Sequence, residues 1–175
     1  MTVRSLDRQQ VRQRAQYRCE FCGVSETDSG AELTVDHFRP STKGGSDSLG
    51  NLVYACNRCN QHKLDYWPET SQQPKLWNPR EDAQEKHFVE LGSGALEALT
   101  DIGEFTIQRL RLNRAPLVEH RKRKRQTAEE VRLLQEYRRL NSVLEQLLAE
   151  QANELQEQKR FLVELSSLVK ILLDK

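Results

Sequence analysis

Four cysteines in two close pairs are the residues of this sequence best suited to bind a metal ion. Cys19 pairs with Cys22 and Cys56 with Cys59, each with the spacing Cys-x-x-Cys. A tight turn points both sulfurs of a pair to one side, so two pairs can supply four thiolates to one Zn²⁺ ion. All four cysteines of the chain are used. The spacing predicts a structural zinc site, because four thiolates leave no coordination position open for chemistry.

The alternatives to zinc are buried free thiols or two disulfides. The first residues contain no apolar stretch of signal-peptide type, and the mean hydropathy is -0.77, which is too polar for a membrane span. We therefore expect a cytoplasmic protein with no membrane partner. In a reducing compartment, paired cysteines more often hold metal than form disulfides.

A carboxylate, an imidazole and two amides lie between and just after the cysteine pairs. They are the adjacent Asp36 and His37, then Asn51, and Asn60 directly after the last cysteine. A neutral imidazole can take a proton from water near pH 7. Carboxylate and amide oxygens are suited to Mg²⁺ or Mn²⁺, which can neutralise charge on a phosphate and on its leaving oxygen. Together these groups could hydrolyse a phosphodiester. Taken singly, Asp36-His37 could be a surface hydrogen bond and each asparagine a cap.

Short elements must bring these side chains together. Residues 33–36 alternate in the manner of a strand, residues 52–55 form a second short strand, and residues 39–50 form a loop rich in Gly, Ser and Thr. Residues 57–64 should form a short helix after the last cysteine pair. Two strands followed by a helix would place Asp36, His37 and Asn60 close to one another.

In combination, residues 19–63 resemble the HNH (His-Asn-His) endonucleases, also called ββα-metal nucleases. The resemblance rests on the two cysteine pairs and on three segments: Asp36-His37-Phe38-Arg39-Pro40-Ser41-Thr42-Lys43-Gly44-Gly45, Asn51-Leu52 and Cys56-Asn57-Arg58-Cys59-Asn60-Gln61-His62-Lys63. It implies a metal-dependent DNA endonuclease that leaves 5′-phosphate and 3′-hydroxyl ends.

The resemblance also implies roles for single residues. His37 is the general base, Asp36 and Asn60 are ligands of a catalytic Mg²⁺ or Mn²⁺, and Asn51 orients the base and fastens the loop. Asn60 stands where the family often has histidine. His62, two residues later, is a further candidate for a metal ligand.

The positive charges of the chain are unevenly distributed. The net charge is +1, yet residues 109–125 hold eight Lys or Arg residues against Glu119 alone. Such a cluster indicates a polyanion partner, here DNA, although a solvated helix face would look the same. The predicted DNA contacts are Arg39, Lys43, Lys63, Arg121, Lys122, Arg123, Lys124 and Arg125.

The chain divides into three predicted segments of an α+β protein. Residues 1–67 form the nuclease core with its zinc site. Residues 68–126 form a loop-and-helix extension that ends in the basic run, with a turn at residues 91–94 and a helix from about Asp101 to Asn113. Residues 127–175 form a helical assembly segment that starts at Thr127, where Glu130 completes a capping pattern.

Apolar residues recur along the last segment at steps of three and four. They predict either one long helix or a hairpin folded back around residues 149–154. The apolar face needs a cover, which could be its own domain, a second copy of the chain or a partner subunit. Two alternatives compete with a nuclease that acts alone. One is a non-catalytic zinc module that binds nucleic acid, and the other is the nuclease subunit of a larger defence complex assembled through the C-terminal helix.

Overall fold

The computed structural model describes residues 5–173, and the chain folds as two compact units, Met1–Lys124 and Arg125–Lys175. The first unit mixes short helices with two small sheets, and the second consists of the greater part of helix α5 (Ala115–Leu173). The predicted α+β class is therefore confirmed. The finer division into residues 1–67, 68–126 and 127–175 stays a prediction.

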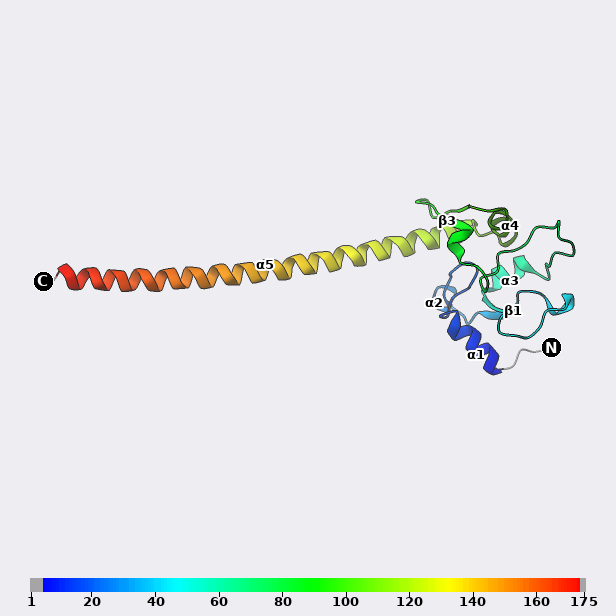
Figure 1. Cartoon of the computed structure of the whole chain (residues 1–175), viewed down its shortest axis with the longest axis horizontal. Helices are drawn as coiled ribbons and strands as arrows, with labels where there is room; N and C mark the ends of the chain where they lie inside the picture. Colours follow the sequence, from blue (N-terminus) through cyan, green and yellow to red (C-terminus); the bar gives the residue numbers. More distant parts are fainter. Residues whose placement is uncertain (1–4, 174–175) are drawn as a thin grey trace. The chain divides into compact units, whose positions relative to one another are not determined.

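A two-stranded sheet and one helix form the centre of the first unit (Figure 1). β1 (Thr34–His37) pairs antiparallel with β2 (Leu52–Ala55), so that Asp36 lies opposite Val53 and His37 opposite Leu52. All four β2 residues are buried, which matches their uninterrupted apolar sequence. α3 (Asn57–Lys63) follows directly. The sequence predicted all three elements, but β1 lies one residue later than the predicted residues 33–36, and α3 ends one residue before the predicted 64.

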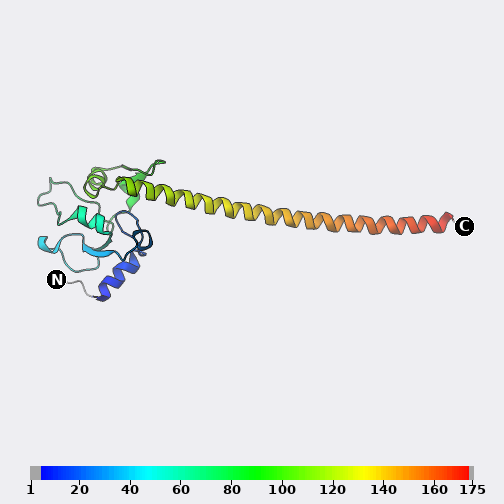
Figure 2. The ribbon, with the colours of Figure 1, turned by 180° about the vertical axis from the view of Figure 1, so that it is seen from behind.

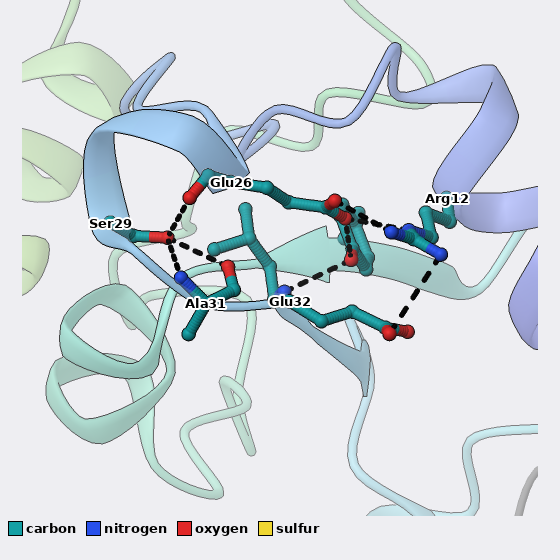
Figure 3. Close-up of polar contacts among 7 residues, drawn as sticks. Arg12, Glu26, Ser29, Ala31 and Glu32 are labelled. Atoms are coloured by element: carbon teal, nitrogen blue, oxygen red, sulfur yellow. Dashed lines mark hydrogen bonds and ion pairs between the residues drawn. The ribbon is translucent and has the colours of Figure 1, made fainter.

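Two helices that the sequence did not predict support this sheet: α1 (Ser5–Arg14) and α2 (Glu26–Ser29). Figure 3 shows the contact that joins them: Arg12 donates two hydrogen bonds to the Glu26 carboxylate, at 2.6 and 2.7 Å. The Tyr54 hydroxyl on β2 also donates to Glu26, and it accepts the backbone N–H of Leu33 at 3.0 Å. The Glu26 carboxylate on α2 thus joins α1 to β2. Through the Tyr54 hydroxyl it is also linked to Leu33, the residue before β1.

The extension contains a second sheet and another helix. β3 (Phe88–Glu90) pairs antiparallel with β4 (Leu96–Ala98) across the predicted turn, and these three-residue strands were too short to predict. α4 (Asp101–Leu110) follows, and Thr100 is its cap, because Thr100 Oγ1 accepts the N–H of Gly103. α4 ends at Leu110, earlier than the predicted Asn113, because Arg111 adopts a left-handed conformation.

The extension shares one hydrophobic core with the central sheet. Its buried members belong to the same cluster as β2: Leu76, Trp77, Phe88, Leu96, Leu110, Leu112 and Leu117. A polar contact adds to the packing, since the buried Glu20 carboxylate lies 2.6 Å from Arg80 Nη2 and accepts the backbone N–H of Tyr54 at 2.7 Å. The two short 3₁₀ turns η1 (Ser41–Lys43) and η2 (Gln84–Lys86) lie in the connecting loops.

The last helix begins at Ala115, not at the predicted Thr127. Proline is tolerated in a first turn because its missing N–H would have no partner there, so Pro116 starts the helix and does not block it. The residues that follow include neither Gly nor Pro, and Figures 1 and 2 show α5 as one uninterrupted ribbon, without the alternative hairpin. Within the described residues no helix is both long and apolar enough to cross a membrane.

Candidate active site

The four cysteine sulfurs form one cluster. The Sγ atoms of Cys19, Cys22, Cys56 and Cys59 all lie within 4.8 Å of one another, and those of Cys22 and Cys56 are 3.7 Å apart. A tetrahedral Zn²⁺ with bonds of about 2.3 Å requires sulfurs roughly 3.8 Å apart, so the residues fit this ion. The four cysteines come from two segments, the knuckle before Gly23 and the start of α3.

The surroundings of Cys56 favour its thiolate form. Cys56 is the N-cap of α3, and its Sγ accepts the N–H of Cys59. Hydrogen bonds from Cys19 and Cys22 hold the pKa of Cys56 well below its ordinary value. Arg114 Nη2 lies 3.9 Å from Cys59 Sγ and brings a positive charge to the negative cluster. Thiolates are the form of cysteine that binds metal.

Asp36 is anchored by a lysine from α3. Lys63 Nζ lies 2.8 Å from Asp36 Oδ2 and donates to the backbone carbonyl of His37 at 2.7 Å. The Lys63 side chain is only 1% exposed, whereas that of Asp36 is 21% exposed. A fully buried ammonium is stable only with such partners. The last residue of α3 therefore fixes the end of β1.

His37 is held by a residue that the sequence did not single out. Its Nε2 lies 2.6 Å from Asp47 Oδ1, and the imidazole is 14% exposed. Asp47 belongs to the loop between β1 and β2, where no spacing rule marks one acidic residue as special. Only the folded loop brings it back to the strand end.

Asn51 clasps that loop with three hydrogen bonds. Its Oδ1 accepts the N–H of Arg39, and its Nδ2 donates to the carbonyls of Arg39 and Ser46. The clasp leaves no room for a side chain at Gly45, where a Cβ would lie 1.8 Å from the Arg39 carbonyl oxygen and 2.8 Å from Asn51 Nδ2. Because Ser46 directly precedes Asp47, the clasp also fixes the partner of His37.

The remaining predicted ligands lie on α3. Asn60 precedes Lys63 by three residues, and residues three apart share one side of a helix, so Asn60 lies on the side of α3 that reaches β1. Asp36 Oδ2 is buried and has no hydrogen bond of normal geometry beside its ion pair with Lys63. Carboxylate and amide oxygens such as those of Asp36 and Asn60 are the ligands that suit a divalent cation.

His62 has different surroundings. Burial, followed by the charges of Arg111 and Arg114, lowers the pKa of its imidazole. The charges of these arginines act on the ring, and no hydrogen bond or ion pair joins His62 to Asp36 or His37, all three of which are described residues.

The predicted DNA contacts fall into two groups. Lys63 and Arg121 are buried and bonded within the fold, since Arg121 donates to the carbonyls of Gly94 and Leu112. These two side chains do not reach the surface, so the expected phosphate contact does not hold for them. The others lie nearer solvent. Arg39 stacks on Trp67, and Lys43 pairs with Glu69 at 2.7 Å. Four more are exposed on α5: Lys122, Arg123, Lys124 and Arg125.

The strands, the helix and the sulfur cluster define a small ββα core with a cysteine metal site. Residues 19–65 match the family model of the HNH endonuclease, a segment that makes up about a quarter of the chain. No curated protein and no solved structure matches the chain. The family match confirms the resemblance predicted from the sequence and supports a nuclease function in general terms.

Proposed function

We propose that this protein is a metal-dependent endonuclease that hydrolyses DNA phosphodiester bonds. The observation that carries the proposal is the end of β1, where two adjacent side chains each have a fixed partner. Asp47 lies 2.6 Å from the His37 imidazole, and Lys63 lies 2.8 Å from the Asp36 carboxylate. Both pairs belong to the segment that matches the HNH endonuclease model.

In this proposal His37 is the general base. A carboxylate at Nε2 favours the tautomer with hydrogen on that nitrogen, which leaves Nδ1 as the atom that takes a proton from water. Asn51 acts through Asp47, because its bond to the Ser46 carbonyl holds the preceding residue in place. The activated water then attacks the phosphorus, and the phosphodiester bond to the leaving oxygen breaks.

Asp36 and Asn60 are the proposed ligands of a catalytic Mg²⁺ or Mn²⁺. Such an ion would supply charge neutralisation at the phosphate and at the leaving oxygen. Lys63 orients Asp36 by holding its inner oxygen, so that the more exposed side of the carboxylate is available. The proposed ligand set omits His62, whose neighbours are cations.

The DNA backbone would meet exposed cations of the first unit. Lys122, Arg123 and Lys124 are consecutive and exposed on α5. Arg39 is exposed two residues after His37, and the half-buried Lys43 ends η1. Cations of this kind supply affinity that weakens steeply with salt. DNA binding should therefore fall as the salt concentration rises.

The second unit is proposed to assemble with a second copy of the chain. Leu133, Tyr137, Leu140, Leu144 and Leu147 follow alternating steps of four and three and are 51–63% exposed. Such a stripe on a helix is typical of a coiled-coil seam. Two copies would bring two sites, one for each DNA strand. Replacing Leu140 and Leu144 by Glu should lower the mass measured by light scattering, and an unchanged mass would remove the stripe as the contact.

Cleavage of supercoiled plasmid in separate reactions with Mg²⁺, Mn²⁺, Ca²⁺ or no added metal tests the proposed activity. We expect nicked and linear products with Mg²⁺ or Mn²⁺, with 5′-phosphate and 3′-hydroxyl ends on sequencing. The alternative, a zinc module that binds nucleic acid without cutting it, predicts shifted DNA mobility and intact plasmid under every condition.

A further inference from the structure

The apolar stripe of α5 continues beyond Leu147 in the same register. Its alternating steps of four and three lead on through residues 151, 154 and 158 to Phe161, Leu165 and Leu168. These three apolar side chains are 41–62% exposed, and every residue from 122 to 170 is exposed in the single chain. The stripe therefore has two apolar halves, residues 133–147 and 161–168, and both are uncovered.

Three polar residues separate the two halves of the stripe: Gln151, Glu154 and Gln158. The order of apolar and polar positions is nearly the same when it is read outward in either direction from a point between residues 152 and 153. Position 151 then corresponds to 154, 147 to 158, 144 to 161, 140 to 165 and 137 to 168. Two copies of the helix that run in opposite directions can therefore place apolar residues against apolar residues on both sides of a polar centre.

The same pairing within one chain would require a hairpin. The chain would have to turn at residues 151–154, whereas α5 is one continuous helix from Ala115 to Leu173 (Figure 2). None of its residues after Pro116 is Gly or Pro, the residues that most often break a helix. The matching strand must therefore come from another chain, and a second copy carries the matching pattern.

The polar centre distinguishes the two possible orientations of such a pair. In a parallel pair in register each residue meets its own counterpart, so Glu154 would meet Glu154 of the second copy, and two like charges would lie within a desolvated stripe. In an antiparallel pair Glu154 meets Gln151 of the second copy, whose amide can donate a hydrogen bond to the carboxylate. The antiparallel orientation therefore removes a repulsion and supplies a donor.

The residues beside the stripe favour the same orientation. One edge is apolar apart from Asn141, and its apolar members are 49–63% exposed: Leu134, Leu148, Leu155, Leu162 and Val169. The opposite edge is acidic apart from Val143: Glu136, Glu150, Glu157 and Glu164. Parallel helices bring opposite edges together, which would set apolar side chains against glutamates, whereas antiparallel helices bring like edges together. Leu148 then meets Leu155 of the second copy, and the acidic edges stay in water, where repulsion costs little.

We propose that α5 pairs antiparallel with α5 of a second copy along residues 133–169, centred between residues 152 and 153. The inference deepens the assembly suggested under the proposed function, to which it adds the orientation and the register. At about 1.5 Å per residue, the two Arg125 residues that begin the second units would lie about 80 Å apart. The two nuclease sites would be joined to opposite ends of the pair and would meet DNA at separate points.

Photo-crosslinking of the full chain tests the orientation. Leu134 is replaced by p-benzoylphenylalanine, the protein is irradiated, and the cross-linked product of double mass is digested with trypsin. Trypsin releases residues 133–138 and 161–170 as separate peptides, because Arg or Lys ends each and precedes each. We expect these two peptides to be joined, since Leu134 lies beside Val169 of the second copy in the antiparallel pair. A first peptide joined to its own counterpart or to residues 126–132, a product of single-chain mass, or a monomeric mass in light scattering would overturn the proposal.

Two substitutions of one residue test the polar centre. Gln151→Lys brings an ammonium to Glu154 of the second copy and should keep the dimer mass, whereas Gln151→Glu brings a second carboxylate there and should weaken dimerisation at least tenfold. Asn153→Glu adds the same charge away from the stripe and should dimerise like the wild type. Equal weakening by Gln151→Lys and Gln151→Glu would overturn the proposed register. These measurements use neither DNA nor added metal, so failure of the nuclease proposal and failure of this one are distinguishable.

Discussion

Lys63 lies with its Nζ 2.8 Å from Asp36 Oδ2, and this ion pair joins the last residue of α3 to the residue next to the end of β1. Sequence reasoning placed Lys63 among the phosphate contacts, because a lysine in a polar segment is usually exposed. Because Lys63 is buried, it has a structural role instead. It neutralises one oxygen of the Asp36 carboxylate and donates to the backbone carbonyl of His37.

Lys63→Met should therefore affect both stability and cleavage. Losing one partner of a buried ion pair leaves the other charge unpaired, which we expect to cost about 2–4 kcal/mol of unfolding free energy. Cleavage should fall about 10–100-fold, and the Mg²⁺ concentration for half-maximal rate should rise, because Asp36 loses its orientation. Denaturant melts and metal titrations measure both effects. Lys86→Met, which removes an exposed lysine paired with Asp82, is the matched control, and equal losses in the two variants would contradict this role for Lys63.

Asp47→Asn should reduce cleavage about 10–100-fold while the fold is kept. An amide can still bond to the imidazole, but it no longer favours hydrogen on Nε2, so Nδ1 is less often the free base. Single-turnover cleavage of a labelled duplex gives the rate. Asp65→Asn, an exposed acid after α3, should cut at the wild-type rate; if Asp47→Asn did so too, the contact with His37 would have no part in the reaction.

The loop clasp can be tested with two glycines of the same loop. Gly45→Ala should disrupt the bonds of Asn51 and lower the cleavage rate at least tenfold, because a Cβ would meet the Arg39 carbonyl at 1.8 Å. Gly50→Ala meets nothing within 4 Å and serves as the control. Zinc content should be normal in both, since the cysteines lie elsewhere. The idea fails if the two variants cut alike.

The contact between Arg12 and Glu26 makes stability depend on pH. The hydrogen bond from Arg12 lowers the pKa of Glu26 below its ordinary value, despite partial burial. The folded state therefore gains from ionised Glu26 above the unfolded pKa, and the gain is lost as pH falls through the lower folded value. Glu26→Gln should melt about 3–6 °C lower at pH 7, with a smaller difference from the wild type below pH 4. Glu32→Gln, a weaker partner of Arg12, is the control; a difference constant with pH would contradict the linkage.

The ββα core and the sulfur cluster could be predicted because their signals are local. A Cys-x-x-Cys pair fixes its own geometry, and the apolar run of β2 is buried on both faces. The start of α5 was missed because Pro116 marks a helix start as readily as a stop.

The partners of the predicted catalytic residues could not be found in this way. Asp47 and Lys63 reach β1 from a loop and from a helix end, ten and twenty-seven residues away from His37 and Asp36. No local pattern encodes such contacts, which form only once the chain has folded.

The most direct test of the account compares the wild type with His37→Ala in plasmid cleavage with Mg²⁺ or Mn²⁺, after metal analysis of both proteins. Each should contain one zinc ion per chain, because the cysteine cluster is independent of His37. The variant should cut about 10²–10⁴-fold more slowly, which is the usual contribution of a general base. Equal loss of supercoiled plasmid in the two samples, at equal zinc content, would contradict the assignment of His37 and the mechanism built on it.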